Sequence, residues 1–235
     1  MQRNAIYNHI LEYARKFPLE NAPVVMDLGC CMGTDIRKLV QDGYPISTSK
    51  SNVYGCDLLP EFVEEGYTLY RDGPNSNSPT PIKFFADDIF QLSLRSETLE
   101  EKAGSSGLKG LRGKIDILYA GALFHLFDEE KQLDLARRLV ALLNINDNSA
   151  NSETIIFGRH RGSPTASKGY QQMEFGKTFC HSPASWKEMW ETVLVDEFGK
   201  QILERLKIEA VVEDLSPDWE TKFNQGWLFW SITIR

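Results

Sequence analysis

The sequence predicts a doubly wound α/β fold, with a mostly parallel seven-stranded sheet that ends in an antiparallel hairpin. Short apolar runs alternate with longer amphipathic segments through the first two thirds of the chain. This is the pattern of parallel strands joined by helices on both faces of a sheet. The last third carries two apolar runs, at 206–213 and 227–235, separated by a turn-rich segment. Consecutive strands of this kind favour antiparallel pairing, so we expect them to close the sheet.

Each expected element follows from its own residues. Buried parallel strands are short and continuously apolar, whereas helices repeat their apolar residues every three or four positions. The expected strands are 24–28, 53–56, 82–86, 115–120, 154–157, 206–213 and 227–235. The expected helices are 35–40, 60–70, 129–143 and 184–198. The polar segments 72–81, 104–113 and 144–152 are expected to be loops, and none is long enough to link two domains.

Composition excludes several classes of function. The 235 residues carry a formal net charge of −7 without a basic stripe, whereas nucleic-acid recognition concentrates lysine and arginine. No apolar run approaches the ~20 residues that span a bilayer, and the polar segment 1–17 is not a secretory signal. The cysteines lack C-x-x-C spacing, which argues against a metal site and a disulfide framework. We therefore expect a cytoplasmic protein without nucleic-acid or membrane partners.

The segment 25–40, VMDLGCCMGTDIRKLV, is the most informative part of the chain. A strand runs into a glycine-containing turn that opens a helix, whose N–H groups favour a carboxylate or phosphate. Gly29 and Gly33 let the backbone approach a ligand closely. A bulky residue at Gly33 is therefore predicted to block binding with only a modest loss of stability. The spacing fits neither G-x-G-x-x-G nor G-x-x-x-x-G-K-[ST], the dinucleotide and phosphate loops.

Acidic residues lie at the carboxyl ends of the first three expected strands, where open α/β sheets bind ligands. Asp27 lies in the first strand, Asp57 ends the second, and Asp87 and Asp88 follow the third. A carboxylate at Asp57 can accept both hydrogen bonds of a ribose diol. Each carboxylate can instead cap a helix, and we expect one of Asp87 and Asp88 to do so.

The loop 27–33 resembles the D-x-G-x-G-x-G loop of S-adenosylmethionine enzymes, with Cys31 in place of the middle glycine. Longer blocks resemble the small class I methyltransferases of fungal polyketide and meroterpenoid biosynthesis. These blocks are DLGCCMGTDIRKLV, YGCDLLPEFVEEGYTLYRD, GKIDILYAGALFHLFDEEKQLDLARRLVALL and IIFGRHRG. The resemblance runs from about residue 21 to residue 190.

The resemblance implies S-adenosylmethionine-dependent O-methylation of a small polyketide-derived acceptor, at a carboxyl group or an acidic enol or pyrone hydroxyl. It implies that Asp27 fixes the methionine amino end and that Asp87 bonds the adenine amino group. The cofactor-binding residues that it implies are Asp27, Gly29, Cys30, Gly33, Asp57, Leu58, Asp87, Asp88, Ile89 and Ala120. The single domain 1–235 would comprise a lid-like helical segment (1–20), a cofactor-binding core (21–160) and an acceptor-side segment with the final hairpin (161–235). Relatives that form methyl esters usually have a longer N-terminal segment, which leaves the acceptor class open.

The acceptor site is expected beyond the fourth and fifth strands. His125 would lie beside the cofactor sulfur, either as a general base or as a packed structural histidine. Arg159 and Arg161 would hold an anionic acceptor, unless they belong to a solvated loop. Tyr119 and Phe124 would line the pocket or belong to the core.

Two other functions stay open from sequence alone. A Rossmann-type NAD(P)-dependent oxidoreductase is disfavoured by the glycine spacing. A non-catalytic S-adenosylmethionine-binding partner of another biosynthetic enzyme would share every motif above. Neither the identity of the acceptor nor the oligomeric state is predicted.

Overall fold

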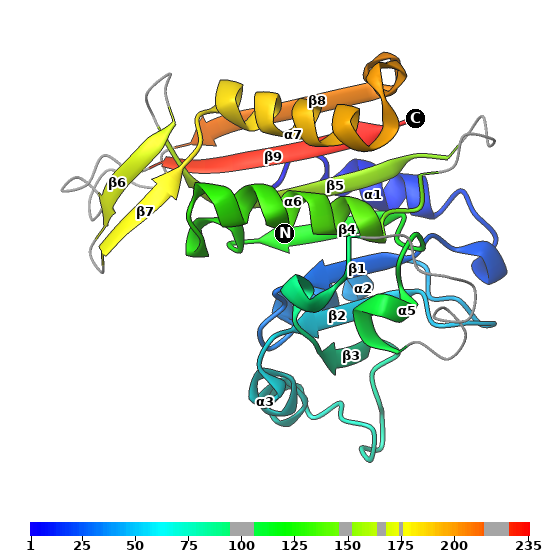
Figure 1. Ribbon diagram of the computed structural model, residues 1–235. Coiled ribbons are helices and arrows are strands. Elements are labelled where there is room, and N and C mark those ends of the chain that lie inside the picture. Colours follow the sequence, from blue (N-terminus) through cyan, green and yellow to red (C-terminus); the bar gives the residue numbers. More distant parts are fainter. Residues whose placement is uncertain (95–105, 146–151, 164–167, 174–175, 214–225) are drawn as a thin grey trace.

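The computed structural model describes residues 1–94, 106–145, 152–163, 168–173, 176–213 and 226–235 (Figure 1). The strands of its main sheet are β1 (Val25–Leu28), β2 (Val53–Asp57), β3 (Lys83–Ala86), β4 (Ile117–Gly121), β5 (Thr154–Gly162), β8 (Leu206–Glu213) and β9 (Gly226–Ile234). The longer helices are α1 (Tyr7–Ala14), α2 (Thr34–Gln41), α3 (Pro60–Tyr70), α6 (Glu129–Leu142) and α7 (Pro183–Phe198).

The sheet has the strand order β3-β2-β1-β4-β5-β9-β8. The strands from β3 to β5 are parallel, and β9 pairs antiparallel with both β5 and β8. The predicted doubly wound α/β fold with a closing antiparallel hairpin is therefore confirmed. The order reverses between β1 and β4, and a crevice at such a point is where this class of fold binds its ligands.

Helices cover both faces of the sheet (Figure 1). All four residues of β1 are buried, as a parallel strand between two helical layers requires. Because strand side chains alternate, Met26 and Leu28 pack in the core on the side of α6 and α7, whereas Val25 packs on the side of α1 and α2. The fold therefore has a core on each face, and its ligand-binding edge is open.

Three features differ from the sequence-based expectation. β5 ends at Gly162 rather than at residue 157, because its charged end pairs with β9 through Arg159 and Arg161. A short helix, α5 (Gly107–Gly110), lies in a segment expected to be a loop. A two-stranded hairpin of β6 (Gly169–Met173) and β7 (Gly176–Cys180) projects beyond the carboxyl end of β5 (Figure 1).

Parts of other expectations lie outside the described residues. These are residues 104–105 and 146–151 of the expected loops and residues 214–225 between the last two strands. No helix in the described part of the chain has the length and hydrophobicity to span a bilayer.

Candidate active site

The turn between β1 and α2 is built on left-handed backbone. The φ angles of Gly29, Cys31 and Gly33 are 74°, 50° and 73°. The N–H groups of Gly29 and Cys30 both donate to the carbonyl of Cys56, at 2.8 and 3.0 Å, which ties the loop to β2. Since left-handed φ favours glycine, Cys31 has the conformation expected of the glycine that it replaces in the motif.

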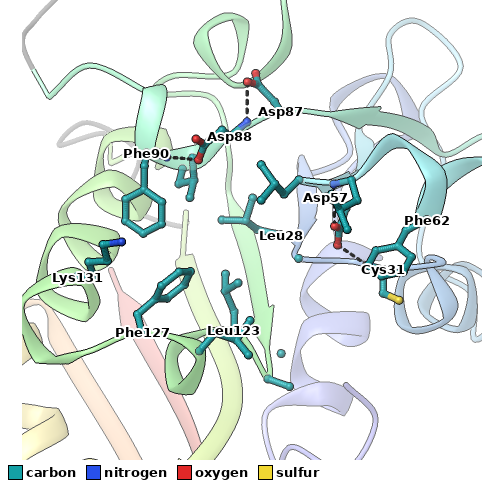
Figure 2. A pocket seen from close by; sticks show the side chains of 17 residues that line it. Leu28, Cys31, Asp57, Phe62, Asp87, Asp88, Phe90, Leu123, Phe127 and Lys131 are labelled. Atoms are coloured by element: carbon teal, nitrogen blue, oxygen red, sulfur yellow. Dashed lines mark hydrogen bonds between the residues drawn. The ribbon is translucent and has the colours of Figure 1, made fainter. Parts of the chain in front are cut away.

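Asp57 ends β2 and points toward this loop (Figure 2). Its Oδ2 accepts a hydrogen bond from the Cys31 N–H at 2.7 Å, and its Oδ1 accepts one from the Leu59 N–H at 3.2 Å. A carboxylate offers about four acceptor positions. Asp57 can therefore hold the loop in place and still accept hydrogen bonds from a ligand.

Asp87 and Asp88 both cap neighbouring backbone, although only one of them was expected to do so. The Oδ1 of Asp88 accepts from the Phe90 N–H at 2.9 Å and begins the 3₁₀ helix η2 (Ile89–Gln91). The Oδ1 of Asp87 accepts from the Asp88 N–H at 2.8 Å, and its Oδ2 accepts from the Leu108 N–H at 2.9 Å. Asp87 thus joins the end of β3 to α5, and its predicted bond to adenine must use the remaining acceptor positions.

A cavity of about 440 Å³ opens at the carboxyl ends of β1 to β4. Its wall is mainly apolar, and the carboxylates of Asp57, Asp87 and Asp88 and the ammonium group of Lys131 also line it. Apolar side chains that line it, as labelled in Figure 2, are Leu28, Phe62, Phe90, Leu123 and Phe127. The cavity therefore suits a flat apolar group that carries hydrogen-bond donors at one edge.

A second cavity of about 360 Å³ adjoins the first, and the two share Gly29, Cys31, Gly121 and Ala122. The second cavity carries charges of both signs. Its lining includes the carboxylates of Asp27 and Asp35, the guanidinium of Arg159 and the phenol of Tyr119. The two cavities therefore meet at the ends of β1 and β4.

Asp27 is buried in this smaller cavity. Burial raises the pKa of its carboxyl well above the usual range, and the negative charge of Asp35 raises it further. The Met1 ammonium group, which lies 2.8 Å from Asp35 Oδ1, lowers the pKa of Asp27. A cation placed beside Asp27 would favour its charged form in the same way. The site is therefore electrostatically suited to an ammonium group.

Most of the predicted cofactor residues are brought together at these cavities, and two are not. The predicted residues that line one cavity or both are Asp27, Gly29, Cys30, Asp57, Leu58, Asp87, Asp88 and Ile89. Ala120 is fully buried in the core, and the chain reaches the cavities only at Gly121 and Ala122. β4 continues one residue further than expected, to Gly121, and the contact of Ala120 with the cofactor stays a prediction.

Gly33 lines neither cavity, and packing rather than a ligand explains the need for glycine there. A Cβ atom on Gly33 would lie 2.5 Å from both the Phe84 ring and Arg37 Nη1. Arg37 is itself fixed, because its Nε donates to Asp72 Oδ2 at 2.7 Å and its guanidinium stacks 4.4 Å from the Phe84 ring. The structure thus gives the glycine at position 33 a packing role, and its approach to the cofactor stays a prediction.

Phe124 also lies elsewhere than expected. It is fully buried and packs against the rings of Trp186, Trp230 and His160, at centroid distances of 4.8, 5.9 and 5.7 Å. This aromatic cluster holds α7 against the sheet. The expected contact of Phe124 with an acceptor is replaced by a role in the core, as the large apolar area of a phenyl ring favours.

His125 lies beside two arginines rather than beside a carboxylate. Its ring packs edge-on to Trp227, with centroids 6.0 Å apart, and both Arg159 and Arg161 stack on the same indole. Burial lowers the pKa of His125 to about 4, helped by the positive charges of Arg161 and Arg159. The imidazole is therefore neutral at neutral pH, and its buried Nδ1 has no hydrogen-bond partner among the described residues.

Among the residues of this region that sequence reasoning missed are Asp35, Lys131 and Trp227. Asp35 lies in the first turn of α2, and its place directly after the glycine loop is a signal that could have been used. Lys131 and Trp227 reach the site from α6 and β9. Their positions depend on tertiary packing, for which the sequence offers no local signal.

The comparisons with known sequences identify fungal relatives. The chain is 33% identical over 171 residues to the O-methyltransferase phiE of a fungal species, and this alignment covers 73% of the chain and 49% of the relative. It is 33% identical over 190 residues to the O-methyltransferase atr3 of Stereocaulon alpinum, covering 80% and 46%. It is 29% identical to the asnovolin E/chermesin D methyltransferase nvfJ of Aspergillus novofumigatus, covering 78% and 58%. The chain thus spans about half the length of these relatives.

Solved structures agree on the fold. A 1,6-didemethyltoxoflavin N1-methyltransferase of Burkholderia thailandensis, bound to S-adenosylhomocysteine, matches with a TM-score of 0.57 at 13% identity, over 99% of this chain and 80% of that one. The magnesium protoporphyrin IX methyltransferase of Synechocystis, bound to S-adenosylmethionine, matches with a TM-score of 0.52 at 14% identity, over 98% and 77%.

No family model matches the chain. The sequence relatives and the strand order nevertheless agree with each other and with the resemblance noted from the motifs. Over about half of their length, the chain is similar in sequence to these fungal O-methyltransferases, and it has the class I methyltransferase fold.

Proposed function

We propose that the chain binds S-adenosylmethionine across the two cavities and transfers its methyl group to an oxygen atom of a small polyketide-derived acceptor. The observation that carries this proposal is that two cavities adjoin: an apolar one with Asp57 at the end of β2, and a smaller one lined by the buried Asp27 and by the start of α2. S-adenosylmethionine has the same two halves, a nucleoside and an amino acid zwitterion. We also propose a cytoplasmic setting in fungal secondary metabolism, without nucleic-acid or membrane partners.

The nucleoside half matches the larger cavity. Adenine would lie between apolar side chains of the wall, such as Leu58 and Leu123, with Asp87 and the N–H groups that follow it at its polar edge. The ribose diol would donate to the free acceptor positions of Asp57. Since Asp57 also holds the Cys31 N–H, ribose binding and loop position depend on the same carboxylate.

The amino acid half matches the smaller cavity. Its ammonium group would lie by Asp27, because burial and the negative charge of Asp35 raise the pKa of that carboxyl and a nearby cation would favour its charged form. Its carboxylate would lie toward the start of α2, where helix N–H groups favour negative charge. The junction of the two cavities, lined by Gly121 and Ala122, is then where the sulfur would lie.

The cofactor would supply a methyl group on a positively charged sulfur, open to displacement by an acceptor oxygen in line with the C–S bond. The chain would contribute chiefly by holding the acceptor in line, an effect worth up to about 7–11 kcal/mol in favourable cases. A carboxylate or acidic enol is already ionised near neutral pH and needs no strong base. Arg159 and Arg161 would hold that negative charge beside the cofactor.

A mass-spectrometric screen tests this proposal. The chain, S-adenosylmethionine and single polyketide acids or pyrones would be incubated, and each acceptor examined for the mass gain of one methyl group. Methylation of an acid or enol oxygen supports the proposal. Cofactor binding without turnover of any acceptor would favour a non-catalytic partner, and turnover only with NAD(P) would make the protein an oxidoreductase.

The environment of His125 predicts how the rate responds to pH. With a pKa of about 4, its imidazole is already unprotonated at pH 5.5, so its titration should not raise kcat between pH 5.5 and 8. His125→Gln should lower kcat by about tenfold or less, because an acceptor that is already ionised needs no general base and the imidazole would then only help to position it. A general base would instead give a loss of about 10²–10⁴-fold. The measurement is a pH–rate profile at saturating cofactor. A rising limb near pH 6.5 that the variant lacks would make His125 the base.

A further inference from the structure

Trp227 lies at the centre of a cluster of cationic side chains that the motifs did not reveal. It is the second residue of β9 and pairs with Arg161 of β5, so the two side chains emerge on the same face of the sheet. The Arg161 guanidinium carbon lies 4.5 Å from the indole centroid, and that of Arg159 lies 5.0 Å from it. His125 packs edge-on against the same indole. One aromatic ring therefore touches three potential anion-binding groups.

Bringing two guanidinium groups to one ring is electrostatically unfavourable by itself, because like charges repel. The negative face of the indole offsets part of this repulsion. His125 does not add a third charge, since burial and the two arginines keep it neutral at neutral pH. An anion bound between the arginines would be attracted by both guanidinium groups. The cluster thus places two positive charges on one ring, an arrangement that suits an anionic group.

The position of the cluster indicates which anion it would hold. Arg159 lines the smaller cavity next to Gly121 and Ala122, and its buried Nε has no hydrogen-bond partner among the described residues. Arg161 lies two residues further along β5, at the outer end of the strand. The pair therefore extends from the junction of the two cavities outward, on the side from which an acceptor would approach.

We propose that Trp227 is a positioning residue that aligns Arg159 and Arg161 into one binding site for the anionic oxygen group of the acceptor. This inference rests on the proposed function. It names a residue through which the protein would select negatively charged acceptors. The planar guanidinium groups stack on the indole and so keep their N–H groups directed along their edges. Lysine in place of either arginine would keep the charge but lose this alignment.

Calorimetric titration with benzoate and with benzamide, which are matched in shape and differ in charge, tests the proposal. The chain is first saturated with S-adenosylhomocysteine. We expect the wild type to bind benzoate and not benzamide. Trp227→Leu should weaken benzoate about tenfold without changing the Kd for S-adenosylhomocysteine, and Trp227→Phe should recover most of the loss. Tyr170→Leu, on the exposed β6, is the matched aromatic control and should change neither.

The possible outcomes separate the inference from the proposed function. If the wild type does not bind S-adenosylhomocysteine, the proposed function fails. If it does, two results would overturn the role of Trp227. The first is a wild type that binds benzoate no better than benzamide, and the second is a Trp227→Leu variant that binds benzoate as tightly as the wild type. Should the leucine variant not fold, Arg161→Lys takes its place. It should also lose benzoate affinity, and full retention would contradict alignment by stacking.

Discussion

Gly33→Val is expected to lower the free energy of unfolding by about 2–5 kcal/mol. The residue has φ 73°, and left-handed backbone costs a residue with a side chain about 1–2 kcal/mol. Its Cβ would also meet the Phe84 ring and Arg37 at 2.5 Å, and overpacking of this kind typically costs about 1–3 kcal/mol. The Arg37 side chain cannot withdraw freely, because it is paired with Asp72. The two costs therefore add.

Urea denaturation measures this loss, and Gly113→Val is the matched control. Gly113 has a similar φ of 65° but no atom within 4 Å of its Cβ position, so its variant carries the backbone cost alone. The difference between the two variants isolates the packing around Gly33. Equal losses would show that the contacts with Phe84 and Arg37 are not tight. The sequence-based expectation was the reverse, a lost ligand with little change in stability.

Asp57→Ala is expected to raise the Kd for S-adenosylmethionine by about ten- to a hundredfold. Hydrogen bonds to a charged group are worth about 1.5–3 kcal/mol, and the alanine variant loses those to the ribose diol. It also loses the acceptor of the Cys31 N–H, which fixes the glycine loop. Both losses act on binding, because Asp57 lies at a strand end beside the larger cavity.

The Kd would be measured by calorimetry on variants with unchanged melting temperature. Asp57→Asn keeps one acceptor oxygen and should fall between the wild type and Asp57→Ala. Asp128→Ala is the control, because Asp128 caps α6 through the Lys131 N–H and lines neither cavity. Unchanged affinity in a folded Asp57→Ala would remove Asp57 from the cofactor site.

The fold could be predicted because its signals are local. The helix expected at 60–70 has the same limits as α3, and the strand expected at 206–213 has those of β8. The expected length of β5 was too short because the outer half of this strand is charged, and a charged segment does not show the apolar run by which strands were predicted. Its pairing with β9 depends on residues distant in sequence. The β6–β7 hairpin was missed for a related reason, since its strands are polar and exposed at their outer ends.

Cavity-lining residues could be predicted where their positions follow from the order of the strands. They were missed where their positions follow from tertiary packing. Asp27 and Asp57 line the cavities because parallel strands end at the same edge. Phe124 was placed at the acceptor because it follows the fourth expected strand, yet its ring packs in the core against Trp186. Gly33 was placed at the cofactor from the glycine motif, which gave no sign of its close packing against Phe84. Trp227 carried no signal, because only the register of β9 on β5 brings it to the arginines.

A calorimetric titration of the chain with S-adenosylmethionine, and separately with NAD, tests the central proposal most directly. The two ligands share an adenine ribose, but NAD requires a loop that accepts a pyrophosphate. The loop from Asp27 to Gly33 has instead a cavity beside it that is lined by the buried Asp27 and by the start of α2, which suits an amino acid zwitterion. We predict saturable one-to-one binding of S-adenosylmethionine and no measurable binding of NAD. Binding of NAD with no heat from S-adenosylmethionine would contradict the proposed function.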